Sequence, residues 1–255
     1  MPRRWRGRSA GTYHAAVATL FIARRFCGPP DSANGGYFAG LTAAVTGRAV
    51  TVRLLRPPPL DVELAVTESG DGSVEVRHRE ELLAQSRLAH ITAPVIAPPG
   101  YLEAIEASRH YVGFNHHPAP TCFVCGPKRG RGDGLRIFPG PLPQRDLVAA
   151  PWVADDSLDA GDGKVRPEFM WAALDCPGWL ALTTSSPMVL LGEITAHVDR
   201  RVHIDERCIL IGWRIGSNGR KHEAGTALFD EDGELCGYAR ALWIEPRSPT
   251  PAQPD

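Results

Sequence analysis

Two segments of the chain contain residue types that could carry out chemistry, and each supplies what the other lacks. Residues 34–45 begin with Asn34-Gly35-Gly36 and continue with small apolar residues. The two glycines predict a helix N-terminus that a substrate can approach closely, with unpaired N–H groups and a dipole that stabilise negative charge. Residues 166–175 start a second helix and end with Asp175, whose carboxylate can activate water or attack an electrophilic carbon. The sequence thus predicts backbone donors in one segment and an acid in the other.

These two segments belong to a pattern that occurs twice. Each helical segment is followed by several short apolar segments, at 50–57, 61–67, 74–78 and 82–91 and again at 190–199, 205–213, 221–229 and 234–244. Asp-Gly or Asn-Gly pairs at 71–72, 218–219 and 232–233 predict hairpin turns between antiparallel strands. The separation of equivalent positions grows from 132 residues, between Ala43 and Asp175, to 152 residues, between Leu83 and Leu235. Such drift is typical of a duplicated domain with longer loops in its second copy.

The pattern predicts an α+β fold in which an antiparallel sheet wraps one buried helix, made twice. The two helical segments are apolar nearly all round, as expected of enclosed helices. We predict a first unit at 12–98, a linker at 99–143 that begins with a helix at 101–108, and a second unit at 144–245. Residues 1–11 and the proline-rich residues 246–255 are predicted to be disordered.

Composition excludes several classes of partner. The 255 residues are 43% hydrophobic, which is ample for a packed core, and the net charge of −1 favours neither nucleic acid nor an anionic membrane. An apolar run at 15–23 follows an arginine-rich start but lacks a small-residue cleavage site, so we interpret it as a strand. No run approaches the ~20 apolar residues of a membrane span. Because six cysteines are scattered over the chain, a reducing compartment is favoured, and we expect a cytoplasmic protein.

The order of these motifs, occurring twice, resembles the hotdog-fold thioesterases and dehydratases, here as a double hotdog. The resemblance covers most of residues 12–245 and includes a linker motif at 122–126, with the sequence CFVCG. It implies two antiparallel sheets, each wrapping a central helix, joined into one extended sheet. It also implies hydrolysis of an acyl thioester, commonly acyl-CoA, with CoA as part of the substrate and no other cofactor. The Asp and His pair of the hydratase branch is missing, which disfavours dehydration. Exposed sheet edges favour a homodimer or higher oligomer.

Carried over position by position, the resemblance assigns Gly35 and Gly36 to an oxyanion hole and Asp175 to the role of base or nucleophile. The reciprocal site would need glycines at 167 and 168 and an acid at position 43. It has Pro167, Glu168 and Ala43 instead, so one composite site per chain is predicted.

Each candidate residue also has a structural alternative. Asn34 could hold a substrate group or simply cap the helix, and Asp175 could be a locally hydrogen-bonded acid at a helix kink before Pro177. A further set of polar and aromatic residues could bind substrate: Tyr37, Glu168, Glu193, His197, Lys128, Arg129 and Arg131. The basic residues of this set could contact CoA phosphates or form a solvated loop. The two acids and the histidine could equally be surface residues or, for Glu168, complement the helix dipole.

Two alternatives concern metal binding and turnover. Cys122 and Cys125, with His116 and His117 upstream, could bind zinc, but the adjacent histidines and the absence of a second cysteine pair disfavour a metal. We therefore predict no metal and buried cysteines that pack the linker against the sheet. Because each copy lacks half of the site, the alternative function is a hotdog protein that binds acyl-CoA or an acyl chain without hydrolysing it.

Overall fold

The computed structural model describes residues 17–92, 94, 96–182 and 189–246. Two segments were predicted to be disordered, 1–11 and 246–255. Both lie outside the described ranges, except for Pro246. In the described part of the chain the strands are β1 (Val17–Phe21), β2 (Val50–Leu54), β3 (Glu63–Glu68), β4 (Val74–His78), β5 (Glu81–Leu88), β6 (Gly140–Leu142), β7 (Leu147–Val153), β8 (Leu190–Val198), β9 (Arg207–Asn218), β10 (Lys221–Asp230) and β11 (Leu235–Ile244). The α-helices are α1 (Gly35–Thr46), α2 (Tyr101–Arg109), α3 (Pro167–Ala173) and α4 (Cys176–Leu180). Short 3-10 helices occupy Arg24–Phe26, Val112–Phe114, Pro143–Arg145 and Asp156–Leu158. Within the described ranges, no helix is long and apolar enough to cross a membrane.

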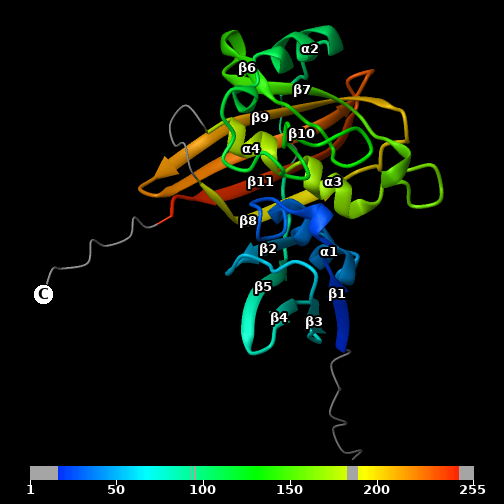
Figure 1. Ribbon diagram of the computed structural model, residues 1–255, viewed down its shortest axis with the longest axis vertical. Helices are drawn as coiled ribbons and strands as arrows, with labels where there is room; N and C mark the ends of the chain where they lie inside the picture. The colour runs from blue at the N-terminus through cyan, green and yellow to red at the C-terminus, as the bar shows by residue number, and fades with distance from the viewer. Residues whose placement is uncertain (1–16, 93, 95, 183–188, 247–255) are drawn as a thin grey trace, which may run out of the picture.

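All described strands form one antiparallel sheet in the order β1-β3-β4-β5-β2-β8-β11-β10-β9-β7-β6. The order of elements is the same in both halves, because β1-β3-β4-β5-β2 corresponds strand for strand to β7-β9-β10-β11-β8 in reverse. The halves join where β2 pairs with β8, and the hydroxyls of Thr51 and Thr195 lie 2.7 Å apart across that pair. The predicted hairpin turns at 71–72, 218–219 and 232–233 connect β3 to β4, β9 to β10 and β10 to β11. Figure 1 shows the long strands of the second half crossing the molecule, with α3 and α4 in front of them.

Helix α1 is defined by its caps and by its glycines. The Asn34 side chain accepts a hydrogen bond from the Tyr37 N–H, and Gly47 ends the helix with a left-handed backbone (φ 59°). The helix is largely buried, as its apolar sequence predicts. A Cβ on Gly40 would lie 2.7 Å from the Cα of Glu168, so only glycine lets α1 approach α3 this closely. The helices of the two halves therefore pack directly on each other (Figure 1).

The second helical segment, for which a kink before Pro177 was one of the predicted alternatives, is not continuous. It is split into α3 and α4, and Asp175 lies at the break. The physical reason is Pro177, which has no N–H to donate to the Ala173 carbonyl one turn earlier. The next carbonyl along the chain, that of Leu174, accepts a hydrogen bond from the Thr226 hydroxyl of β10, at 2.8 Å. A Cβ on Gly212 would lie 2.2 Å from the Pro177 carbonyl oxygen, so β9 carries a glycine where α4 crosses it.

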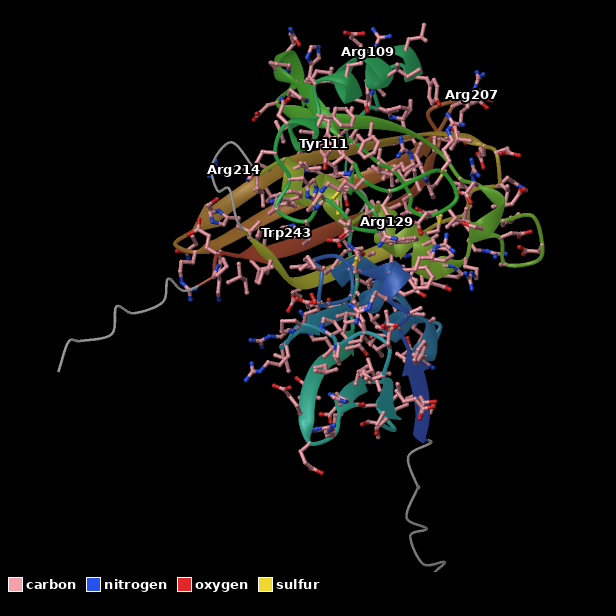
Figure 2. The ribbon with its side chains drawn as sticks, viewed as in Figure 1. Arg109, Tyr111, Arg129, Arg207, Arg214 and Trp243 are labelled. Atoms are coloured by element: carbon pink, nitrogen blue, oxygen red, sulfur yellow. The ribbon has the colours of Figure 1, made fainter. Side chains whose placement is uncertain are left out.

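The linker wraps the second half and contributes to both faces of the sheet. Its predicted helix is present as α2, which packs with Ala104 and Ala107 against β7. Its CFVCG segment packs on the other face, in the same core as α1 and α3. Tyr111 is 1% exposed and donates a hydrogen bond to the Cys125 carbonyl at 2.8 Å, which fixes this segment from inside (Figure 2).

Candidate functional site

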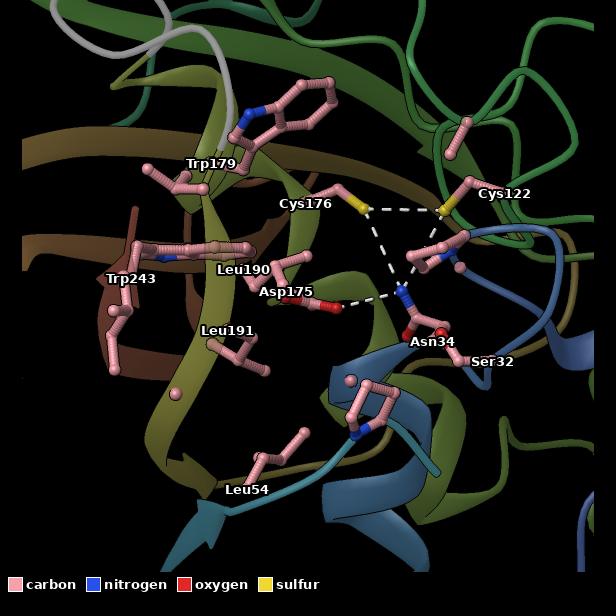
Figure 3. Close-up of a pocket in the computed structure, with 18 of the residues that line it drawn as sticks. Ser32, Asn34, Leu54, Cys122, Asp175, Cys176, Trp179, Leu190, Leu191 and Trp243 are labelled. Carbon is pink, nitrogen blue, oxygen red and sulfur yellow. Dashed lines mark hydrogen bonds between the residues drawn. The ribbon is translucent and has the colours of Figure 1, made fainter. Parts of the chain in front are cut away.

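The carboxylate of Asp175 lies at the N-terminus of α1, although 139 residues separate it from Gly36. Its Oδ2 atom accepts a hydrogen bond from the Gly36 N–H and another from Asn34 Nδ2, each at 2.9 Å. Figure 3 shows the second of these hydrogen bonds. A Cβ on Gly36 would lie 2.5 Å from the Cβ of Asp175, so this contact requires glycine. The break between α3 and α4 turns the acid toward α1. The two chemically distinct segments therefore meet in one place.

The Asn34 side chain both caps α1 and holds the Asp175 carboxylate. Its Oδ1 caps α1 through the Tyr37 N–H at 2.9 Å, and its Nδ2 donates to Asp175. Nδ2 also lies 3.9 Å from Cys122 Sγ and 4.0 Å from Cys176 Sγ (Figure 3). The cap fixes the side-chain rotamer, so the amide nitrogen is held toward the carboxylate.

The environment of Asp175 favours the protonated acid. The residue is 3% exposed, and burial raises the pKa of its carboxyl from 3.8 to about 7. The Gly36 N–H and the Asn34 amide oppose this rise in pKa, while negative charge on Cys122 adds to it. The second carboxylate oxygen, Oδ1, is buried and has no hydrogen-bond partner in the described part of the chain. A carboxylate of this kind exchanges a proton near neutral pH and has one oxygen free to accept it.

The two glycines are not equivalent, which differs from the expectation that both amides are free to form an oxyanion hole. The Gly36 N–H is engaged by Asp175, because the acid lies directly over the start of the helix. Gly35 lines the adjacent cavity. Among the described residues its N–H has no acceptor, whereas the Tyr37 and Phe38 N–H groups are bonded to Asn34. The amide available to a ligand is that of Gly35.

Beside these groups lies a cavity of about 580 Å³. Asn34, Gly35 and Asp175 form its polar end, and the remainder of the wall is mostly apolar. The apolar residues come from β2, β8, β11 and α4 and include Leu54, Leu190, Leu191, Trp179 and Trp243 (Figures 2 and 3). No sequence pattern identifies these residues, because they are of ordinary core type and only the tertiary structure brings them together around a cavity. An apolar cavity with one polar end suits a small polar group attached to an apolar chain.

Three cysteine thiols also line the cavity. Cys122 and Cys125 belong to the linker and Cys176 follows the acid, and their sulfur atoms all lie within 4.8 Å of one another. Cys122 and Cys176 are 3.8 Å apart (Figure 3). Nε2 of His117 lies 3.4 Å from Cys125 Sγ. The CxxC spacing was visible in the sequence, but no sequence signal pointed to Cys176 as a neighbour.

Tyr37 and Glu168, two predicted substrate-binding residues, do not line this cavity. The Tyr37 ring is buried and stacks on Phe26, with 4.3 Å between ring centroids, and burial raises its pKa to about 12. Glu168 lies at the start of α3, 3.6 Å from the Nε atom of Arg166. Both side chains serve packing and local charge pairing in this structure.

Glu193 and His197 lie on the opposite face of the sheet from α1 and α3. They alternate along β8 with Ile194 and Ala196, which face the buried core. Glu193 pairs with Arg87 at 3.3 Å and borders a separate groove on that outer face. His197 pairs with Asp199 at 3.2 Å. The sheet therefore separates them from Asp175.

The residues of the predicted basic loop do not line the cavity either. Lys128 and Arg131 are exposed. Arg129 is only 10% exposed, because it bonds the carbonyls of Thr121 and Arg25, and Figure 2 shows it within the body of the molecule. The arginines that line the cavity are Arg56 and Arg220, neither of which was among the predicted site residues.

No protein-family profile matches the sequence, and no curated protein matches it by sequence similarity. Solved structures do match. A tesB protein from Mycobacterium avium subsp. paratuberculosis is 11% identical, with a TM-score of 0.60 over 91% of this chain and 93% of that chain. A protein assigned as a thioesterase from Novosphingobium aromaticivorans is 13% identical, with a TM-score of 0.59 over 92% and 98%. A protein of unknown function with a hotdog fold from Alicyclobacillus acidocaldarius is 8% identical, with a TM-score of 0.54 over 93% and 96%.

These similarities extend over nearly the whole of each chain. At such low identity they establish the fold alone, which is that of the hotdog and thioesterase-like structures. The resemblance predicted from the sequence is thereby confirmed at the level of the fold.

Proposed function

We propose that this chain hydrolyses an acyl thioester, such as an acyl-CoA, at the single composite site formed by α1 and the break between α3 and α4. Each half of the sheet is, in this proposal, one hotdog unit, and the pair forms a double hotdog. The observation that carries the proposal is the buried Asp175, with one oxygen held by Gly36 and Asn34 and the other unpaired at the polar end of an apolar cavity.

In the proposed reaction the apolar wall, the Gly35 N–H and Asp175 have different roles. The acyl chain lies along the apolar wall, and the thioester carbonyl lies at the polar end near the Gly35 N–H. Ionised Asp175 takes a proton from a water molecule, and the resulting hydroxide attacks the carbonyl carbon. The Gly35 N–H and the α1 dipole stabilise the oxyanion, the C–S bond breaks, and the leaving thiolate takes the proton back from Asp175. The products are a carboxylic acid and a thiol.

A variant of this route uses Asp175 as the nucleophile. Its free oxygen would attack the carbonyl carbon and release the thiolate, forming a mixed anhydride that water then hydrolyses. A single turnover in water labelled with heavy oxygen tests for the nucleophile route. The base route puts the label in the product acid and none in the protein, whereas hydrolysis of the anhydride at its aspartyl carbonyl puts the label in the Asp175 carboxylate and none in the product acid.

The phosphates of a CoA substrate would leave the cavity past Arg56 and Arg220. Both line the cavity. Arg56 is paired with Glu81 at 2.9 Å and Arg220 donates to the Glu245 carbonyl at 2.7 Å, so both guanidinium groups are oriented. They replace the loop containing Lys128, Arg129 and Arg131 as the proposed phosphate contacts.

The second candidate function is binding of acyl-CoA or an acyl chain without hydrolysis. It is favoured by the engagement of the Gly36 N–H with Asp175, which leaves one helix amide at the cavity instead of two. A panel of acyl-CoA esters of different chain length, with a thiol reagent, separates the candidates. Hydrolysis predicts thiol release that collapses in Asp175→Asn, whereas the binding function predicts saturable binding with no thiol release. Full activity in Asp175→Asn would disprove the proposed site.

A further inference from the structure

The three-thiol cluster is not used in the proposed reaction, and its geometry is specific. Cys122, Cys125 and Cys176 are buried and free, and they come from two segments about 50 residues apart. The 3.8 Å between Cys122 Sγ and Cys176 Sγ is far longer than the ~2.05 Å of a disulfide bond. No disulfide joins these residues, yet three sulfurs converge on one point.

The separation matches that of thiolates around a tetrahedral zinc ion. Zinc–sulfur bonds of about 2.3 Å at tetrahedral angles place two sulfurs about 3.8 Å apart. Cys122 and Cys176 have this separation, and all three sulfurs lie within 4.8 Å of one another. Closing the cluster around an ion therefore requires shifts of no more than about 1 Å.

The groups around the sulfurs are hydrogen-bond donors, as expected around metal-bound thiolates. Asn34 Nδ2 lies 3.9 Å from Cys122 Sγ and 4.0 Å from Cys176 Sγ. His117 Nδ1 accepts a hydrogen bond from the Ala119 N–H at 2.8 Å, which leaves the ring proton on Nε2, 3.4 Å from Cys125 Sγ. His117 thus serves as a donor to the cysteine sulfur and not as a fourth ligand.

We propose that Cys122, Cys125 and Cys176 bind one Zn²⁺ ion, with a fourth coordination position open to the cavity. Thiolates are the ligands that zinc prefers among soft donors, and these three residues all line the cavity. The site departs from the sequence-based expectation of no metal, because the third ligand is supplied only by the tertiary structure. It goes beyond the proposed hydrolysis, since zinc binding does not depend on turnover.

The ion would join the linker to the residue that follows the acid. Cys176 begins α4 directly after Asp175, while Cys122 and Cys125 belong to the linker. A metal ion that binds the folded chain and not the unfolded chain stabilises the folded state by mass action. The zinc site would therefore fix the position of the break that presents Asp175 to α1.

The test is the metal content of the whole chain, purified under anaerobic, reducing conditions without chelator. Elemental mass spectrometry is expected to give about one Zn²⁺ per chain. Replacing zinc with Co²⁺ is expected to give the near-ultraviolet thiolate charge-transfer band and the intense visible bands of tetrahedral cobalt. Cys125→Ser and Cys176→Ser should each lose most of the bound metal and the charge-transfer band. His117→Ala should keep the stoichiometry and bind zinc roughly tenfold more weakly.

Cys208→Ser is the matched control, because Cys208 is an equally buried free cysteine outside the cluster. It should retain full zinc content. The proposal is overturned if the reduced, folded wild-type chain takes up neither Zn²⁺ nor Co²⁺, or if Cys208→Ser loses as much metal as Cys176→Ser. Asp175→Asn should still bind one Zn²⁺, so loss of hydrolysis and loss of metal are separate results.

Discussion

Asp175 Oδ2 lies 2.9 Å from the backbone nitrogen of Gly36, and this contact joins the two halves of the chain at their chemically active points. One carboxylate oxygen is held by a helix amide and a capping asparagine, and the other is buried without a partner in the described residues. The acid is thus fixed in position while one oxygen remains available.

Hydrolysis should depend on the ionisation of Asp175. Because burial raises the pKa of this carboxyl to about 7, the active carboxylate is lost as pH falls through neutrality. We expect kcat/KM to be half-maximal near pH 7 and to fall about tenfold per pH unit below it. Asp175→Asn should lower kcat by about 10²–10⁴ at all pH values. A profile that stays flat from about pH 5 to 8 would exclude this acid as the group that sets the rate.

Asp175→Asn should also increase stability at alkaline pH. The folded-state pKa of about 7 lies above the ordinary value of 3.8, so the folded chain retains a proton that the unfolded chain releases. Ionisation of this carboxyl therefore destabilises the fold progressively from about pH 4 to pH 7, by up to about 4 kcal/mol above that range. The asparagine removes this cost and keeps an oxygen acceptor for the Gly36 N–H. Denaturant unfolding should show the variant to be more stable near pH 8, with an advantage that shrinks toward pH 4.5. An equal advantage at both pH values would contradict the assignment of the raised pKa.

Gly36→Ala should destabilise the chain by about 3 kcal/mol or more. An alanine Cβ would lie 2.5 Å from the Cβ of Asp175 and 2.8 Å from the Trp171 carbonyl oxygen, and neither helix can move without disturbing the other. The control is Gly216→Ala in β9, where an added Cβ meets no atom within 4 Å. Chemical denaturation of both variants measures the difference. If they prove equally stable, the close approach of α1 and α3 is not required by the fold.

Replacing Asn34 should separate its two roles. Asn34→Ser keeps an oxygen that can cap the Tyr37 N–H but loses the amide donor to Asp175. Because that donor favours the ionised acid, its loss should raise the pKa of Asp175 and move the pH–rate midpoint upward by about 0.5 to 1 unit. Asn34→Ala should show the same shift and lose about 1 kcal/mol of stability in addition. A pH midpoint that moves in neither variant would indicate that Asn34 acts only as a cap.

We predict that the chain forms a homodimer or higher oligomer in solution. The sheet ends at β1 on one side and at β6 on the other, and its outer face carries an open groove lined in part by β8 and β11. Exposed edges and faces of this kind are usually covered. Size-exclusion chromatography with light scattering should give a mass that is a multiple of 27.7 kDa. A clean monomer over a wide concentration range would contradict the prediction.

Much of the fold was predictable because it depends on local signals. Alternating apolar residues and Asp-Gly or Asn-Gly pairs specified the hairpins, and β9, β10 and β11 begin within two residues of their predicted positions. The second helical segment was correctly predicted as buried, and a kink before Pro177 was one of the predicted alternatives, but its complete division into α3 and α4 was not predicted. Pro177 is a local signal for a kink, whereas the hydrogen bond from Thr226 to the Leu174 carbonyl at the break depends on a distant strand.

Residue types and their spacing were enough to predict that an acid and a glycine-opened helix occur in complementary copies of one pattern. The amide that the acid engages, the position of the cavity and the side chains around it depend on long-range packing, which no local pattern encodes. Glu193 and His197 fell on the far face of the sheet because alternation along β8 fixes two faces without saying which one is covered. Cys176 joined Cys122 and Cys125 because the path of the linker sets that distance, and no local pattern encodes it.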